Sequence, residues 1–290
     1  MSVIVNTNVA SLIAQNNLAK NTTALNKSMQ QISSGLRINS ASDDAAGLSI
    51  SESIKNQING NTKAMSNIQD GKNLLAVGEG GMVTVTSHLQ RIRELCVQAA
   101  NETYKGSDKT NMLQEIKQRL KDINNIASST TFNGVPLLDG TKSSLYLQTG
   151  ANSDKNVNAI DIGPALSDVH ISVLGSTVPG DKGIIIPDST TGDTWSTQNI
   201  RDYMDKLDTA ITTLTSNRAL LGAYGNRLDA TADNLSVMNQ NLEQTKSRIL
   251  DTDVASASSD MVKFQILQQT SASILKSANQ LPSLALSLLG

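Results

Sequence analysis

Residues 200–249 read IRDYMDKLDTAITTLTSNRALLGAYGNRLDATADNLSVMNQNLEQTKSRI, and this stretch decides the fold of the chain. An Ile or Leu stands at every seventh residue, which predicts one helix about 75 Å long, at about 1.5 Å per residue, with a single apolar seam. A second position, four residues after each of the first seven seam residues, is apolar in some heptads and polar or Gly in others. We therefore expect a bundle of unequal helices in which polar residues fix the register. The apolar seam is Ile200, Leu207, Leu214, Leu221, Leu228, Leu235, Leu242 and Ile249, and the mixed seam is Met204, Ile211, Arg218, Gly225, Ala232, Asn239 and Lys246.

Three apolar stripes at helical spacing in the first half of the chain supply partners for this seam. Two of them flank ETYKGSD (Glu102–Asp108), whose Gly and capping Ser107 or Asp108 predict an antiparallel helix pair. Because the stripes need the seam to complete their burial, both chain ends must pack side by side in a long, coiled-coil-like helical bundle. The stripes are Ile54, Ile58, Met65, Ile68 and Leu75; Met82, Val85, Leu89, Ile92, Cys96 and Ala99; and Leu113, Ile116, Leu120, Ile123 and Ala127.

The middle of the chain is predicted to loop out of this bundle. FNGVP (Phe132–Pro136) ends the helical period, because Asn-Gly and Pro both mark turns. Ser143–Gly150 and Asn158–Gly163 predict two short strands of a small hairpin, and His170–Gly175 could add a third. Residues 176–197, with GIIIP at their centre, predict a short variable loop or a very small extra element.

The two extreme ends of the chain carry apolar stripes with no obvious wall within the chain to cover them. Each stripe predicts an amphipathic segment that awaits another copy of the protein. The N-terminal stripe is Val9, Leu12, Leu18, Leu25, Met29, Ile32 and Leu36. The C-terminal stripe is Met261, Phe264, Leu267, Ile274, Leu275, Leu281, Leu284, Leu286, Leu288 and Leu289.

The composition suits thin helical bundles better than a compact globule, because aromatic residues make up only 2% of the chain. A net charge of −2 draws the chain neither to nucleic acid nor to acidic lipid. Its single cysteine excludes an intrachain disulfide, and no apolar run is long enough to span a membrane. The N-terminus does not have the pattern of a secretory signal peptide, which alone would favour the cytoplasm.

Sites for chemistry are not expected in this sequence. His88 and His170 lie in different predicted elements, and we interpret them as solvated side chains rather than metal ligands. Gly78–Gly81 follows no strand and does not have the GxGxxG spacing, which favours a hinge or helix break over a dinucleotide loop. Neither HExxH nor GxxxxGK[ST] occurs. These features predict a protein that is not an enzyme and needs no cofactor.

Two other candidates for reactivity also have structural interpretations. Cys96 falls in an apolar stripe between Ile92 and Ala99, where a small buried side chain is expected. The acidic pair Asp43–Asp44 stands in SASDDAAGLSIS, which we interpret as a helix start capped by Ser42 or Asp43.

Several long motifs resemble bacterial flagellin. They are SSGLRINSASDDAAGLSIS (33–51), VNTNVASLIAQNNL (5–18), LQRIRELCVQAAN (89–101), ALLGAYGNRL (219–228), DTDVASASSDMVKFQILQQTSASIL (251–275) and the terminal ANQLPSLALSLLG (278–290). The resemblance covers both flanks in the right order and lacks only the middle. It implies inner-tube helices at 1–45 and 251–290, a rod domain from 46–175 and 200–250 with the hairpin, and a short variable loop at 176–199.

The resemblance also implies a function and partners. It implies a structural subunit that polymerises into the flagellar filament for motility and leaves the cell unfolded through the flagellar type III channel. The implied partners are other copies of the chain, an export chaperone, the filament cap protein and the hook–filament junction proteins. The chaperone and inner-tube contacts would lie at Met261, Phe264, Leu267, Ile274, Leu275, Leu284 and Leu288.

The helix pair around Arg91 resembles the segment of many flagellins that Toll-like receptor 5 of animal hosts recognises. The residues that match this segment are Gln90, Arg91, Glu94, Leu95 and Glu115, and they could equally serve contacts between subunits. The alternative function is that of the hook–filament junction protein, which shares weaker versions of both ends. The absence of HExxH disfavours a flagellin that carries a metalloprotease.

Overall fold

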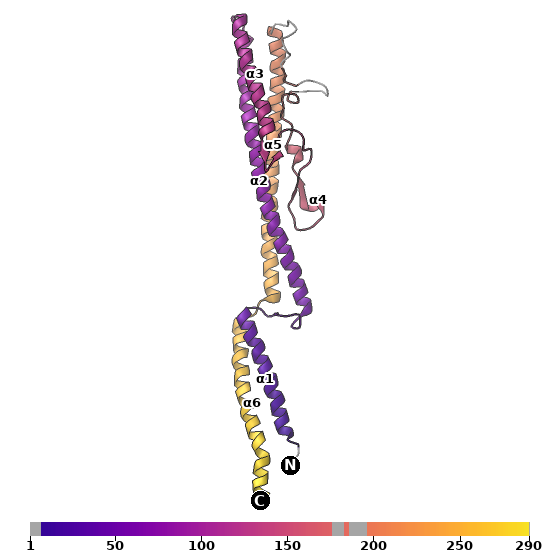
Figure 1. The fold of residues 1–290 in the computed structure, drawn as a ribbon, viewed down its shortest axis with the longest axis vertical. Helices are drawn as coiled ribbons and strands as arrows, with labels where there is room; N and C mark the ends of the chain where they lie inside the picture. The colour runs from indigo at the N-terminus through magenta and orange to yellow at the C-terminus, as the bar shows by residue number, and fades with distance from the viewer. Residues whose placement is uncertain (1–6, 176–182, 186–195, 290) are drawn as a thin grey trace. The chain divides into compact units, whose positions relative to one another are not determined.

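The computed structural model describes residues 7–175, 183–185 and 196–289, with side chains as far as residue 280. The chain is mainly helical, as predicted (Figure 1). Its contacts divide it into two compact units, which we call the end unit (residues up to Ile58 and from Gln240) and the middle unit (Asn59–Asn239). In chain order the elements are α1 (Val9–Ser34), α2 (Ala45–Ala99), α3 (Gly106–Ser129), β1 (Thr131–Phe132), β2 (Val135–Pro136), β3 (Tyr146–Gln148), α4 (Lys155–Asn158), β4 (Ala159–Asp161), the 3-10 turn η1 (Gly163–Ala165), α5 (Thr197–Leu250) and α6 (Val254–Leu289).

The predicted seam runs through the hydrophobic core of the middle unit. Every seam residue from Ile200 to Leu235 is buried, while Leu242 and Ile249 are half-buried, and the mixed seam lies half-buried beside it. The α2 stripe from Met82 to Ala99 is completely buried, so its prediction is confirmed. In the other two stripes Ile54, Ile68, Leu75, Ile116, Leu120, Ile123 and Ala127 are buried, and Ile58, Met65 and Leu113 are half-buried.

The antiparallel pair of α2 and α3 forms as predicted, but its cap differs. Helix α3 begins at Gly106 after Lys105, and the Asp108 carboxylate accepts a hydrogen bond from the Lys105 backbone N–H at 3.3 Å. Asp108 therefore caps from the third helical position, as the acidic residue of a capping box does.

Helix α2 runs unbroken through Gly78–Gly81, so the prediction of a hinge or break there is wrong. Gly81, and Gly71 earlier on the same helix, allow close packing instead. A Cβ placed on Gly81 would stand 2.7 Å from Leu138 Cδ1, and one on Gly71 would fall even closer to Leu147. Glycine is a weak helix former, but a larger residue at these positions would clash, because the segment after α3 lies directly against the backbone of α2.

Two small antiparallel strand pairs follow α3. The predicted hairpin is confirmed as β3 and β4, with Leu147 opposite Ile160, although both strands are shorter than expected. The FNGVP turn also pairs β1 with β2, which was not predicted. Asn133 and Gly134 form this turn with φ of 49° and 76°, the backbone that a two-residue hairpin requires.

The predicted third strand at His170–Gly175 is wrong. Asp168 Oδ1 accepts the backbone N–H of His170 at 2.8 Å, and the His170 carbonyl then accepts the N–H groups of Val173 and Leu174, which makes a turn. Of the loop predicted at 176–197, residues 176–182 and 186–195 lie outside the described residues. The described centre is anchored, because Ile184 is buried and its carbonyl accepts the Tyr203 hydroxyl at 2.7 Å.

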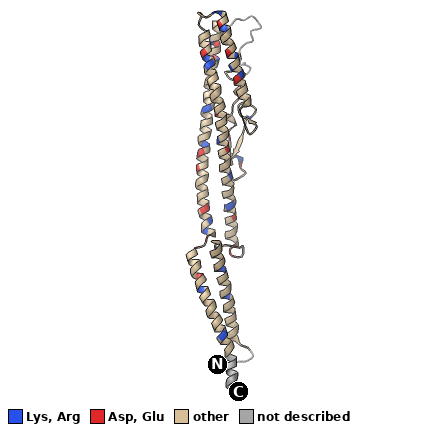
Figure 2. Cartoon of the chain, turned by 60° about the vertical axis from the view of Figure 1, so that its left-hand side comes forward, with Lys and Arg blue, Asp and Glu red and all other residues tan. Residues whose placement is uncertain are grey.

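In the end unit, α1 and α6 lie side by side and antiparallel (Figure 1). Asn8 caps the start of α1 by accepting the Ser11 N–H at 3.0 Å, and Gly35 ends the helix in the left-handed conformation with φ of 72°. Asp253 caps α6 by accepting the Ala255 N–H at 2.9 Å. Lys, Arg, Asp and Glu are mixed along the long helices, and few of them lie on α1 and α6 (Figure 2).

Candidate functional site

The α1–α6 pair is joined by small and polar side chains. Ser11 Oγ donates to Asn279 Oδ1 at 2.7 Å, and Asn21 Nδ2 donates to Ser271 Oγ at 2.9 Å. Such side chains let two helices approach closely but bury little apolar area. The buried residues along the pair are Ser11, Ala14, Ser28, Ala257, Ser271 and Ala278.

Many large apolar side chains of the same pair lie on its outside, although Leu18, Leu25 and Ile32 of the predicted N-terminal stripe are half-buried. Ile13 and Ile266 are each 56% exposed, although a side chain of this size is favourably buried by about 1.5–3 kcal/mol. Of the predicted contacts, Leu267 and Ile274 are exposed, and Met261, Phe264 and Leu275 are half-buried, while Leu284 and Leu288 lie outside the described side chains. The exposed set is Val9, Leu12, Ile13, Met29, Val254, Val262, Ile266, Leu267 and Ile274.

Where α1 and α5 end, each helix is capped by the other half of the chain. Arg37 donates its backbone N–H to the Leu250 carbonyl at 2.5 Å and its Nη2 to the Ile249 carbonyl at 2.7 Å. In return, the Thr252 N–H donates to the Gly35 carbonyl at 3.0 Å, and Leu36 pairs with Asp251 as an isolated antiparallel bridge. The last carbonyls of a helix have no partner within it, so these bonds satisfy groups that would otherwise need water.

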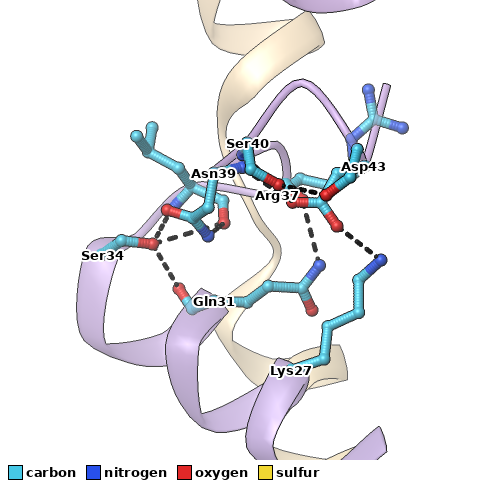
Figure 3. A network of polar contacts seen from close by, with 9 residues as sticks. Lys27, Gln31, Ser34, Arg37, Asn39, Ser40 and Asp43 are labelled. Carbon is cyan, nitrogen blue, oxygen red and sulfur yellow. Dashed lines mark hydrogen bonds and ion pairs between the residues drawn. The ribbon is translucent and has the colours of Figure 1, made fainter. Parts of the chain in front are cut away.

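The loop from Gly35 to Asp44 is also fastened to α1. Lys27 and Gln31 of α1 are directed at this loop (Figure 3). Lys27 Nζ lies 2.8 Å from Asp43 Oδ1, and Gln31 Nε2 donates to the Arg37 carbonyl at 3.1 Å. The Lys27 ammonium, helped by the backbone N–H groups of Asn39 and Ser40, lowers the pKa of Asp43 to about 2.

The residue that caps α2 is Asp44, one position after the predicted Asp43. Asp44 Oδ1 accepts the Gly47 N–H at 2.9 Å and caps the helix, rather than Ser42 or Asp43. Asp43 faces back toward the loop, where its Oδ2 accepts the N–H groups of Asn39 and Ser40, each at 3.2 Å. The two acids of this pair thus hold two different elements.

The predicted receptor segment forms a charged face across α2 and α3. Arg91 lies 2.9 Å from Glu94 and 3.4 Å from Glu115, which in turn accepts from Arg119 at 2.9 Å. The hydrogen bond to Glu94, with the charge of Glu115, raises the pKa of Arg91, and the Arg119 hydrogen bond lowers the pKa of Glu115. Gln90 is exposed beside them, whereas Leu95 is only 3% exposed and packs into the core of the middle unit.

The histidines are less solvated than predicted, because both are half-buried. His170 Nδ1 lies 2.7 Å from Asp168 Oδ1, and its Nε2 lies 3.2 Å from Ser128 Oγ, so it ties the end of α3 to the following turn. Cys96 is buried as predicted, and burial raises its pKa to about 12. Across the described residues no group of three His, Cys, Asp or Glu side chains could hold a metal, and no helix is both long and apolar enough to cross a membrane.

Sequence reasoning missed the role of Arg37 and the small residues between α1 and α6. Arg37 binds backbone carbonyls, which every residue carries, so no pattern of side chains could have indicated its partner. The small and polar residues gave a signal that could have been used, because Ala14, Asn21 and Ser28 recur every seven residues on one face of α1.

Comparison with known proteins gives matches at both flanks of the chain. Residues 5–143 match the bacterial flagellin N-terminal helical region, and residues 204–289 match the bacterial flagellin C-terminal helical region. A flagellin of Halalkalibacterium halodurans is 37% identical over 287 residues, covering 99% of this chain and all of that protein. A flagellin of Bacillus subtilis is 38% identical over 311 residues, covering 98% of this chain and 99% of that protein.

Among solved structures, a proposed flagellar hook-associated protein of Vibrio parahaemolyticus has a TM-score of 0.60 at 15% identity. The match covers 72% of this chain and all of that protein, and at this identity it shows a shared fold alone. The sequence relatives are much nearer, and they span the whole length of the chain. The chain therefore belongs to the bacterial flagellins, a family of structural proteins of the flagellar filament.

Proposed function

We propose that this chain is the subunit that polymerises head to tail into the flagellar filament, and that the α1–α6 pair is its main assembly surface. The observation that carries the proposal is the distribution of side chains on this pair. Small and polar residues lie between the helices, and large ones such as Ile13 and Ile266 lie outside. A second copy that covered those side chains would supply the apolar burial that the pair itself does not have.

Assembly would then be coupled to ordering of the chain ends. Fixing one residue of backbone costs about 1–2 kcal/mol, and an isolated helix pair joined by polar contacts offsets this cost poorly. The ends would remain poorly ordered in the free subunit and become ordered only against neighbours. A contact between unlike surfaces of successive subunits does not close on itself, so it produces an open helical filament.

Electron microscopy of the purified protein, before and after seeding with filament fragments, tests this proposal. Filaments should grow from the full chain and should fail to grow from chains lacking residues 1–45 or 251–290. A sharper variant is Ile13→Gln combined with Ile266→Gln, which should stop elongation without changing the melting temperature of the free subunit. Ile13→Leu with Ile266→Leu is the matched control. Normal elongation of the Gln variant would refute the assigned surface.

Export and its partners follow from family membership as finer proposals. The subunit would travel unfolded through the flagellar type III channel, with a chaperone on the segment Met261–Leu289 until assembly. The exposure of Leu267 and Ile274 supports this, because an apolar face that is exposed to water before assembly would promote aggregation unless a partner covered it. Ile274→Gln should weaken chaperone binding in a pull-down, with Lys276→Gln as control, and equal binding would count against this segment. The cap and junction proteins would contact the assembled end units.

Recognition by Toll-like receptor 5 is proposed for the charged face of α2 and α3. The exposure of Gln90, Arg91 and Glu94 supports it, and the buried Leu95 would act mainly by placing its neighbours on α2. Arg91→Ala with Glu115→Ala should abolish activation of reporter cells by the free subunit. Arg93→Ala, on the side of α2 that faces Asp208, is the control. Full activity of the double variant would disprove this site.

A further inference from the structure

We infer that Arg37 is a positioning residue that makes the two chain ends order as one unit, through reciprocal capping of α1 and α5. This inference rests on the proposed assembly role of the α1–α6 pair. It goes beyond that role because it assigns the coupling to one side chain of the N-terminal half.

Neither helix end is complete within its own half of the chain. The Ile249 and Leu250 carbonyls close α5, and both are bound by Arg37. The Gly35 carbonyl at the end of α1 is bound by the N–H of Thr252, which lies two residues before α6. Each half of the chain thus supplies the donors that the other half needs.

The side chain of Arg37 supplies a charged donor to the end of α5. A guanidinium close to the C-terminus of a helix also interacts favourably with the negative end of the helix dipole. The backbone N–H of the same residue donates to the Leu250 carbonyl, so the side chain and the main chain of Arg37 both bind the end of α5. The side chain of Gln31 donates to the Arg37 carbonyl, which connects these contacts to α1.

The same set of contacts continues forward into α6 and back into α1. Asp253 caps α6 one residue after Thr252, and Asp43 fastens the loop to Lys27 of α1. Loss of the Arg37 side chain should therefore loosen the start of α6 as well as the loop at 35–43. By thermodynamic reciprocity, loss of the α6 cap should also loosen the loop, although Asp253 does not belong to it.

Hydrogen exchange of the full-length chain, in the free subunit and in filaments, tests the coupling. Arg37→Ala should speed exchange at residues 35–43 and at 252–257 together, by roughly three- to tenfold, as loss of one exposed hydrogen bond predicts. Asp253→Ala should speed exchange at the same two segments. Arg248→Ala is the control, because it removes a second Arg from the last turn of α5.

Separate effects would overturn the inference, with Arg37→Ala loosening only residues 35–43 and Asp253→Ala loosening only α6. Exchange that is fast at Arg37 and Thr252 in both states would also overturn it, because the capping bonds would then not form. A chain that never assembles would refute the proposed function alone. The capping bonds would then have to protect residues 35–43 and 252–257 in the free subunit, and joint loss of that protection in Arg37→Ala would still test the coupling.

Discussion

Arg93 of α2 and Asp208 of α5 form a two-point contact, with Nε 2.5 Å from Oδ1 and Nη2 3.2 Å from Oδ2. Lys72 stands 21 residues before Arg93 and meets Asp229, which stands 21 residues after Asp208. The two helices thus keep one antiparallel register over three heptads. Two polar residues of the mixed seam, which were expected to fix the register, also meet α2: Asn239 accepts from Asn61, and Arg218 lies 3.5 Å from Glu79.

This register predicts the result of a charge exchange. Arg93→Asp alone and Asp208→Arg alone each place like charges opposite one another and should lower the melting temperature. The double exchange should recover most of the loss, although the pair is half exposed and its effect should be small. Circular dichroism melting of the three variants measures this, and a double variant no more stable than the single ones would contradict it.

The low pKa of Asp43 predicts a dependence of stability on pH. A carboxyl whose pKa falls from 3.8 to about 2 on folding contributes stability that is full above about pH 4 and is lost as the pH falls toward 2. Asp43→Asn should lose this contribution at every pH and show a flatter profile. Hydrogen exchange near Lys27 between pH 2 and pH 7 follows the effect. Glu52→Gln, which removes an exposed pair, is the control.

Neighbouring glycines of α2 should respond oppositely to alanine. Gly80 has open space around its Cβ position, so Gly80→Ala should stabilise the chain by about 0.5–1 kcal/mol. At Gly81 the new Cβ would meet Leu138, which is completely buried, and Thr130, so Gly81→Ala should destabilise by about 1–3 kcal/mol. Urea unfolding measures both, and equal effects would show that α2 does not pack closely there.

The anchor of the variable segment can be tested at Tyr203. Burial, with a smaller contribution from nearby Cys96, raises the pKa of this phenol, so it remains protonated and donates to Ile184. Tyr203→Phe should cost about 0.5–1.5 kcal/mol in urea unfolding and should speed proteolysis next to Ile184. Tyr224→Phe is the matched control on the same helix. Unchanged proteolysis would mean that the other contacts of Ile184, including its backbone bond to Ile171, hold it without the Tyr203 hydroxyl.

Cys96 should be inert in the folded chain. With its pKa raised to about 12 and its side chain completely buried, almost no accessible thiolate exists near pH 8. Iodoacetamide should therefore label it only as fast as the middle unit opens, and labelling in urea should follow the unfolding curve. Rapid labelling in buffer would show local opening between α2 and α5.

The long helices could be predicted because their large apolar residues repeat at helical spacing and must be buried. The break at Gly78–Gly81 was wrong because propensity treats glycine as a weak helix former, whereas close packing of Leu138 requires it. The strand at His170–Gly175 was wrong because one side-chain acceptor, Asp168, turns the backbone.

The candidate site was less predictable than the fold. The predicted stripes contain only part of the outward apolar set, because Ile13, Val254, Val262 and Ile266 belong to neither stripe. The bonds of Arg37 involve carbonyls that no pattern marks. The burial of Leu95 could have been predicted, because it follows Ile92 by three residues and falls on the edge of the same stripe. The domain boundaries drawn from the family resemblance remain a prediction.

The contacts of Ile184 bear on where the chain can accept inserted residues. Gly183 and Ile184 are fixed to the turn at Ile171 and to Tyr203, so the variable segment is attached at its centre as well as at its two ends. Ile184 therefore separates residues 176–182 from residues 186–195 in the sequence. An insertion into either stretch should leave the contacts of Ile184 with Ile171 and Tyr203 in place.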